Sequence, residues 1–297
     1  MQDGSFPIAS QLHREVTAQI IAAIEAGADE YVMPWHARGA HGRPINAHTG
    51  SPYHGGNVVA LWAAGMLRGY RSAHWATYRQ WNLLGAQVKK GERASRIIFY
   101  RVSEAVADEA EAPKQCHVLI RSSAVFNADQ VEGWQEPELA LPDLTARIPA
   151  VDAAIEGTGA VIRYGFDHAA YRVDGDWIEM PEARQFTDTR GSTATEAFYA
   201  TLFHELTHWT GAAHRLDRPL AGRFNDPSYA TEELIAELGA AFLCADLGIT
   251  NSPRSDHAAY LSHWLQILTE DGRALFKAAR AAEAAAEHIL GRCDTVF

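Results

Sequence analysis

The chain has 297 residues, enough for two domains of ordinary size with separate hydrophobic cores. Hydrophobic residues make up 47% of the sequence and charged residues 21%, and no stretch approaches the roughly 20 apolar residues of a membrane-spanning helix. The first residues also lack the basic and apolar regions of a signal peptide. We therefore expect a globular cytoplasmic protein with no membrane partner.

The charge is distributed unevenly along the chain. The net charge is −11, yet residues 1–103 contain 11 Lys and Arg against 6 Asp and Glu, whereas residues 104–297 contain 15 against 31. A basic segment joined to an acidic one is typical of proteins that combine a nucleic-acid-binding part with a second function.

The front part of the sequence predicts a mixture of helices and strands. Apolar periodicity gives helices at 8–27, 58–68 and 73–81 and strands at 96–102 and 116–126. Asn57 is expected to cap the second helix. In the third, aromatic and basic residues are interleaved, and a polar, basic turn at 87–93 follows it.

Interleaved aromatic and basic residues make this region a candidate for binding single-stranded nucleic acid. Aromatic rings offer stacking platforms for unpaired bases, and basic side chains follow the phosphates. The residues that we select for this role are Tyr53, Asn57, Arg71, Trp75, Tyr78, Arg79, Trp81, Lys89, Lys90 and Arg93. Helical spacing also buries aromatic rings, so a core role competes with a binding role for each tryptophan.

A second domain is expected after a linker rich in Glu and Pro at 131–149, which separates residues 1–130 from residues 150–297. Its predicted elements are short strands at 160–164, 170–173 and 177–180, a helix that includes 197–209, and helices at 229–247, 256–269 and 272–290. The whole chain is therefore expected to have an α+β fold, with a small sheet that precedes the helices of the second domain.

The sequence His-Glu-Leu-Thr-His at 204–208 fits the HExxH pattern of zinc sites. Residues four apart on a helix share a face, so His204 and His208 can bind one ion. Glu205 lies beside the ion without being required as a ligand, where it can take a proton from a zinc-bound water. Thr193 and Glu196 form a capping box that starts the helix.

A catalytic zinc site needs three protein ligands, and three residues compete to be the third. His214 completes a metzincin pattern, but that fold needs a later methionine turn, and every methionine precedes the motif. Glu233 on the next helix would give two histidines and one glutamate, as in gluzincins, and we favour it. Glu237, four residues further, is placed to hold a ligand histidine, or to be the ligand itself. Glu232 is expected on a solvated face.

Two parts of the sequence resemble antirestriction proteins of the ArdC type. Residues 53–102, with YHGGNVVALW and WATYRQWNLLGAQVKKGER followed by a strand, resemble the N-terminal single-stranded-DNA-binding domain of that family. FHELTHWTGAAHRLDRPL followed by YATEELIAELGAAFLCADLGI resembles the zincin-like metallopeptidase domain that comes next. The resemblance covers nearly the whole chain.

The resemblance implies one zinc ion per chain at His204, His208 and a downstream glutamate, with Glu205 as catalytic base. It also implies binding of single-stranded DNA and protection of incoming plasmid or phage DNA from host restriction. A protein of a restriction system would then be a possible peptidase substrate, although a motif does not identify a substrate. His214 departs from the family, where a small or polar residue is expected.

Two other functions fit the same residues. The chain could be a zinc peptidase whose front domain recruits protein substrates, which predicts no salt-dependent affinity for DNA. It could also be a non-enzymatic DNA-coating protein with a structural metal. That function requires a closed site with four protein ligands, and His214 is the available fourth.

Overall fold

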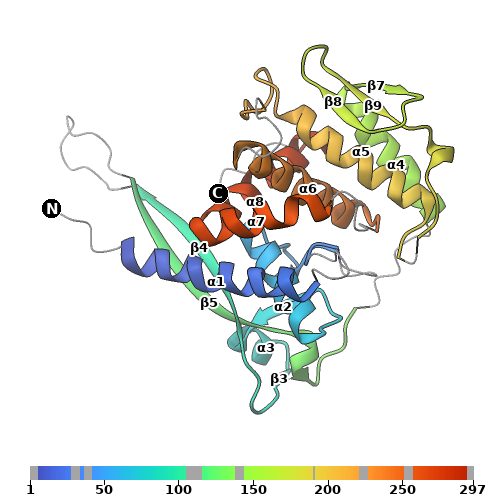
Figure 1. The fold of residues 1–297 in the computed structure, drawn as a ribbon. Helices are drawn as coiled ribbons and strands as arrows, with labels where there is room; N and C mark the ends of the chain where they lie inside the picture. The colour runs from blue at the N-terminus through green and yellow to red at the C-terminus, as the bar shows by residue number, and fades with distance from the viewer. Residues whose placement is uncertain are drawn as a thin grey trace.

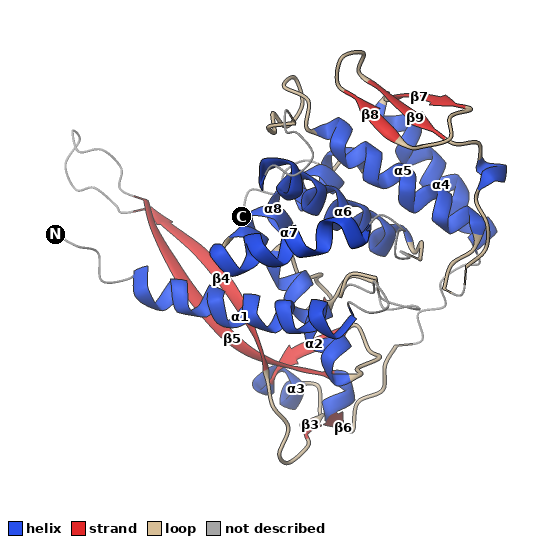
Figure 2. Ribbon diagram, viewed as in Figure 1, coloured by secondary structure: helices blue, strands red, loops and turns tan. Residues whose placement is uncertain are grey.

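The computed structural model describes residues 6–27, 34–36, 42–104, 116–137, 144–189, 191–220, 227–250 and 257–292. Figure 1 shows an N-terminal lobe, residues 6–137, and a C-terminal lobe, residues 144–292. Helices predominate in the C-terminal lobe, and the longest strands lie in the N-terminal lobe (Figure 2). The predicted α+β fold is confirmed.

The N-terminal lobe is built on a four-stranded sheet of order β1-β2-β5-β4. Its elements are α1 (Phe6–Gly27), β1 (Ile45–Asn46), α2 (Gly56–Arg68), β2 (His74–Thr77), α3 (Tyr78–Leu83), β3 (Gln87–Val88), β4 (Ser95–Glu104), β5 (Cys116–Asn127), the 3₁₀ turn Ala128–Gln130 and β6 (Val131–Glu132). β3 pairs with β6 in a separate ribbon. The β4–β5 hairpin extends away from the body of the molecule (Figure 1).

The predicted helix at 73–81 is wrong in its first half. Residues 74–77 form β2, which lies between β1 and β5, and the helix begins only at Tyr78. Thr77 caps that helix by accepting a hydrogen bond from the backbone N–H of Gln80, and the Gln80 side chain returns to the Thr77 backbone. A capping residue has extended backbone angles, so the residues before it are free to join a sheet.

The C-terminal lobe combines a small sheet of order β7-β9-β8 with five helices among its described residues. The elements are α4 (Leu144–Thr158), β7 (Val161–Tyr164), β8 (Ala170–Arg172), β9 (Trp177–Met180), the 3₁₀ turn Ala183–Gln185, α5 (Ala194–Thr210), α6 (Pro227–Leu247), α7 (His257–Glu270) and α8 (Ala274–Ile289). The capping box of Thr193 and Glu196 at the start of α5 is confirmed. Helix α5 contacts β8 and β9, and α6 packs against α5 and α8.

The expected linker contains regular structure at both ends. β6 pairs with β3 in the N-terminal lobe, and α4 begins at Leu144. Glu136 accepts a hydrogen bond from Ser72 at 2.9 Å and lies 2.8 Å from Nδ1 of His74, so residues up to 136 are attached to the first lobe. The segment that joins the lobes is thus shorter than the linker at 131–149 that its content of Glu and Pro indicated.

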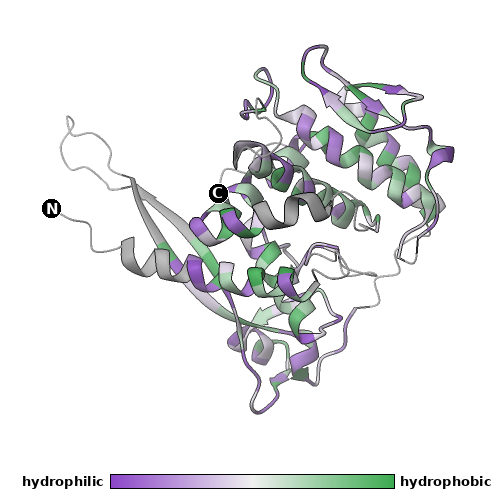
Figure 3. Ribbon diagram, viewed as in Figure 1, coloured by the Kyte–Doolittle hydropathy of each residue, from purple (hydrophilic) through white to green (hydrophobic). Residues whose placement is uncertain are grey.

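The two lobes share one continuous hydrophobic core. α1 contacts α7 and α2 contacts α8, and the buried residues of these helices form a single cluster with those of α5 and α6. Hydrophobic residues are prominent on α2, whereas α5 carries hydrophobic and hydrophilic residues together (Figure 3). Trp62 on α2 lies against Phe242 on α6, with ring centroids 5.7 Å apart. Among the described residues, no helix combines the length and apolar character needed to cross a bilayer.

Candidate metal centre and nucleic-acid interface

Three side chains from α5 and α6 converge on one point. The Nε2 atoms of His204 and His208 lie 3.2 Å apart. Oε2 of Glu233 is 3.5 Å from Nε2 of His204, and its Oε1 is 3.6 Å from Nε2 of His208. Ligand atoms bound to a tetrahedral zinc ion at about 2.0–2.2 Å are separated by about 3.3 Å. The separations are close to this value, although each histidine lies nearest a different oxygen of Glu233.

The donor set also fits a metal. Two imidazoles and one carboxylate suit Zn²⁺ and other divalent ions of the first transition row. Within the described parts of the chain, His204, His208 and Glu233 are the one group of three such residues whose ligand atoms lie within 4.8 Å of one another. Three protein ligands leave a fourth position for water or substrate, as in catalytic zinc sites.

Gly239 allows α5 and α6 to approach closely enough for this convergence. A Cβ atom at Gly239 would lie 2.5 Å from both Cγ2 and Oγ1 of Thr207, a distance that real Cβ atoms do not tolerate. Thr207 belongs to the motif and is fully buried. A glycine facing it on α6 thus sets the spacing at which Glu233 reaches the two histidines.

A second carboxylate lies against the Nδ1 atom of each histidine, whereas Glu233 faces the Nε2 atoms. Nδ1 of His204 is 3.0 Å from Oε1 of Glu237, and Nδ1 of His208 is 3.1 Å from Oε1 of Glu232. Such contacts fix the tautomer and orientation of a ligand histidine. The expectation that Glu232 is solvated is wrong, because its exposure is only 7% and Arg218 donates to it through Nε at 3.0 Å and Nη2 at 2.8 Å.

Neighbouring groups favour the ionised forms of Glu233 and Glu232. Burial alone would raise the pKa of Glu233, but the hydrogen bond from His204 and the charges of both histidines lower it to about 2. Burial likewise opposes ionisation of Glu232, and hydrogen bonds from His208 and Arg218 lower its pKa overall. A negative charge at Glu233 is what a cation requires of that ligand.

Glu205 points toward the small sheet. Its Oε2 accepts a hydrogen bond from the backbone N–H of Tyr171 at 2.9 Å, and its exposure is 4%. Tyr171 lies on β8, an edge strand of the order β7-β9-β8. The carboxylate is therefore anchored to the strand beside the histidines.

The loop after α5 directs His214 away from the cluster. Arg215 stacks on Trp209, with the guanidinium carbon 3.8 Å from the ring centroid, and donates to both carboxylate oxygens of Asp176 and to the Tyr171 hydroxyl. Nε2 of His214 lies 3.4 Å from Oδ2 of Asp176, and its side chain is 64% exposed. The structure does not bring His214 to the other histidines.

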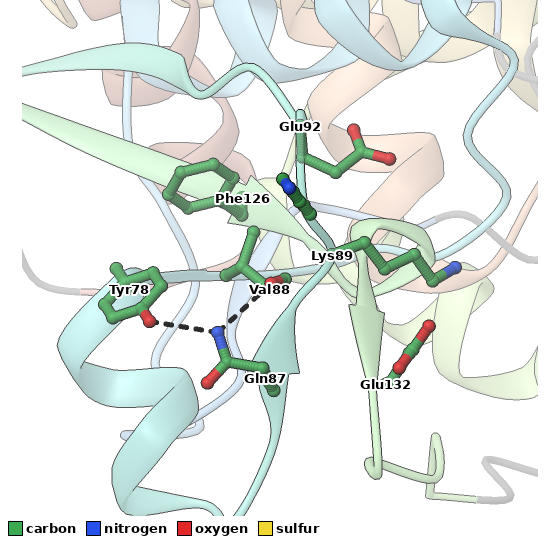
Figure 4. Close-up of a pocket in the computed structure, with 8 residues that line it drawn as sticks. Tyr78, Gln87, Val88, Lys89, Glu92, Phe126 and Glu132 are labelled. Carbon is green, nitrogen blue, oxygen red and sulfur yellow. Dashed lines mark hydrogen bonds between the residues drawn. The ribbon is translucent and has the colours of Figure 1, made fainter.

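A surface pocket of about 620 Å³ lies on the N-terminal lobe, between α3, β3 and the end of β5. The residues that line it are Tyr78, Gln87, Val88, Lys89, Lys90, Glu92, Phe126 and Glu132. Figure 4 shows the rings of Tyr78 and Phe126 on the side opposite the Lys89 ammonium group. Nε2 of Gln87 donates to the Tyr78 hydroxyl at 2.9 Å, and the tyrosine is 47% exposed. The pocket combines an accessible aromatic ring with two lysines and two glutamates.

Three aromatic residues selected from the sequence are part of the core. The exposures of Tyr53, Trp75 and Trp81 are 6%, 2% and 0%. Nε1 of Trp81 donates to the Phe126 carbonyl at 3.0 Å, and the Tyr53 hydroxyl donates to the Trp75 carbonyl at 3.2 Å. A ring covered on both faces cannot stack on a base, so the prediction that these rings contact DNA is corrected.

Asn57 is also occupied within the protein. It does not cap α2, which starts at Gly56 after Gly55. Its side-chain amide donates to the Ile98 carbonyl at 2.7 Å and its oxygen accepts from the Ile98 N–H at 2.8 Å, which ties α2 to β4. The remaining selected residues are exposed: Arg71, Tyr78, Arg79, Lys89, Lys90 and Arg93.

Comparisons with known proteins match both lobes. A family model for the N-terminal domain of anti-restriction factor ArdC matches residues 10–130, and one for zincin-like metallopeptidases matches residues 149–281. The metal-free crystal structure of the antirestriction protein ArdC from plasmid R388 superposes with a TM-score of 0.76 at 40% identity, covering 95% of this chain and 99% of that one.

The chain belongs to the ArdC antirestriction family.

Other relatives also match most of this ArdC-family chain. The Mn(II)-bound structure of the R388 protein has a TM-score of 0.70 at 38% identity, covering 96% of this chain and 99% of that one. Protein y4eC of Sinorhizobium fredii is 41% identical, covering 94% of this chain and 91% of its own length. DNA primase TraC of Escherichia coli is 34% identical over 94% of this chain, which corresponds to only 27% of the primase.

Sequence reasoning missed two residues of this ArdC-family site. Glu232 contacts His208 and Arg218 donates to Glu232, yet both were outside the predicted set. The available signal was the pair of adjacent glutamates at 232 and 233, opposite two histidines that each have two ring nitrogens to satisfy. Residues adjacent on a helix point about 100° apart, so each can reach a different imidazole.

Proposed function

We propose that this ArdC-family protein protects incoming plasmid or phage DNA from restriction by binding it as a single strand, and that its C-terminal lobe is a zinc metallopeptidase. The observation that carries the proposal is the convergence of His204, His208 and Glu233 at separations that suit one zinc ion. Membership of an antirestriction family supports the biological role.

The residues around this point suit peptide hydrolysis. When bound, zinc supplies a Lewis acid that polarises a carbonyl group and lowers the pKa of water. Glu205 is the base that accepts the proton of the attacking water, and the Tyr171 N–H orients its carboxylate. The exposed position of His214, beside Asp176, argues against a closed structural site with four protein ligands.

DNA binding is assigned to the N-terminal lobe. Tyr78 offers a partly exposed ring for a base, and Lys89 and Lys90 beside it offer cations for phosphates. Arg71, Arg79 and Arg93 are exposed on the same lobe and extend the positive charge. Stacking and phosphate contacts carry little sequence information, so binding is expected to be sequence-tolerant.

The test is a titration of the full chain with single- and double-stranded DNA at two salt concentrations, combined with metal analysis. We expect a preference for single strands that weakens steeply with salt, because each neutralised phosphate releases counterions. We also expect one zinc per chain, lost in His204→Ala and His208→Ala. Affinity independent of salt would contradict the DNA assignment, and metal retained when both histidines are replaced would contradict the site.

A further inference from the structure

The segment 34–36 of the N-terminal lobe reaches into the helices of the C-terminal lobe. Trp35 is 2% exposed and packs edge-on against Trp264 of α7, with ring centroids 6.2 Å apart. The next side chain, His36, is fully buried, and its Nε2 lies 3.8 Å from Oε2 of Glu237 on α6. A histidine from the first lobe thus contacts the carboxylate that orients a metal-site histidine.

Glu237 connects this contact to the metal centre. One of its oxygens faces His36, and the other lies 3.0 Å from Nδ1 of His204. The carboxylate is only 4% exposed, so water does not compensate its charge, and both oxygens need partners within the protein. His204 lies within hydrogen-bonding distance of one oxygen, and the imidazole of His36 lies within ion-pair distance, 3.8 Å, of the other.

Arg43, in the next described part of the N-terminal lobe, also binds the helices of the C-terminal lobe. The Arg43 guanidinium lies 3.0 Å from Asp246 of α6 and 2.6 Å from Glu283 of α8, and it stacks 4.9 Å above the Phe242 ring. These contacts attach the first lobe to the helix that carries Glu237. The N-terminal lobe is therefore held against α6 near both His36 and Arg43.

We propose that His36 is a positioning residue of the metal centre, which fixes the Glu237 carboxylate and through it the ring of His204. The proposal rests on the proposed metal site at His204, His208 and Glu233. It makes the centre depend on a residue outside the zincin-like segment 149–281. Since coupling between two sites is reciprocal, a bound ion should also strengthen the contact between the lobes.

Calorimetric titration of the chelator-treated full chain with Zn²⁺, and separately with Mn²⁺, tests the proposal. Glu237→Gln should weaken affinity by about 10- to 100-fold, as loss of outer contacts to ligand histidines does, and His36→Leu by about tenfold. The double variant should be no weaker than Glu237→Gln alone, because both changes interrupt the same connection. His36→Gln should recover most of the affinity, since its amide can donate to the carboxylate.

His54→Ala is the matched control. His54 also bridges the lobes, with Nδ1 2.8 Å from Glu283, but it does not contact Glu237. We expect its metal affinity to equal that of the unchanged protein. If His36→Leu does not fold, His36→Asn replaces it: Asn has the same amide as Gln but a shorter reach, and should lose the affinity that Gln keeps.

The outcomes separate the two proposals. Metal binding that survives His204→Ala overturns the proposed site itself. Binding lost in His204→Ala but unchanged in His36→Leu overturns only the role of His36. Additive losses in the double variant, or equal losses in His36→Leu and His54→Ala, would likewise show that His36 stabilises the fold without positioning Glu237.

Discussion

The adjacent residues Glu232 and Glu233 of α6 contact different atoms of the two histidines. Glu233 faces the Nε2 atoms of both histidines, whereas Glu232 faces Nδ1 of His208 and is itself held by Arg218. Replacing Glu232 would leave the buried Arg218 without its carboxylate and would free the His208 ring to rotate. We therefore expect replacement of Glu232 to lower both the metal affinity and the stability of the protein.

We predict that Glu232→Ala weakens Zn²⁺ binding by about 10- to 100-fold, the range found for outer contacts of metal ligands. The measurement is a competitive titration against a chelator of known affinity. Glu156→Ala, at an exposed position of α4, is the control and should leave affinity unchanged. Equal affinities for the two variants would show that His208 does not depend on Glu232.

Glu205 offers a way to separate catalysis from metal binding. Glu205→Gln retains the size of the side chain but not the base, so it should keep its zinc and its DNA affinity. Any peptidase turnover should fall by about 10²- to 10⁴-fold. Plasmid protection decides the mode of action: protection that survives the change points to DNA coverage, and protection that disappears points to cleavage of a restriction component. Loss of zinc would mean that Glu205 is misassigned.

Tyr78 and Trp81 lie on the same short helix, and we expect their substitution to affect different properties, DNA affinity and stability. Tyr78→Ala removes a partly exposed ring and should weaken single-stranded DNA binding by about 1–3 kcal/mol with little change in stability. Trp81→Ala removes a fully buried ring and should cost about 3–5 kcal/mol of folding free energy. Fluorescence anisotropy and thermal unfolding distinguish the two. Unchanged DNA affinity in Tyr78→Ala would move the binding surface elsewhere.

At the scale of elements, the contact between α5 and α6 depends on the absence of a side chain at Gly239. Gly239→Ala would force its Cβ against Thr207, which is fully buried and cannot move aside. We predict a loss of about 1–3 kcal/mol in stability and weaker metal binding, because the helices must separate. Gly65→Ala in α2 is the control: no atom lies within 4 Å of the added methyl group, so it should be neutral or stabilising.

The sequence predicted those elements whose signals are local. The capping box and the HExxH spacing lie at or within α5, and the strands 177–180 and 96–102 are short runs that contain β-branched and aromatic residues. β2 was missed because four residues next to a helix give too short a pattern, and its burial depends on pairing with β5. His36 carried no signal, since its importance depends on the distant residue Glu237.

For the whole molecule, the contact between lobes should depend on pH. Burial opposes ionisation of Glu283, but the hydrogen bond from His54 and the charge of Arg43 lower its pKa below the ordinary 4.5. A lowered carboxylate pKa gives stability that is complete above 4.5 and is lost as the pH falls through the folded-state pKa.

We therefore predict that the difference in melting temperature between the unchanged protein and Glu283→Gln is constant between about pH 5.5 and 4.5 and shrinks at lower pH. Thermal unfolding in the presence of chelator measures it without interference from the metal. Comparing the two proteins cancels the titration of other carboxylates. A difference that grows on acidification would contradict the assigned pairing.

The shared core restricts how this sequence can be recombined. A breakpoint between residues 137 and 144 that exchanged one lobe for a relative's would place a foreign partner opposite Arg43 and opposite the Trp62 contact with Phe242. Such hybrids should express poorly unless the facing residues are exchanged together. The two lobes should therefore be exchanged between relatives only together. The match to the TraC primase fits this expectation, because it covers 94% of this chain within a much longer protein.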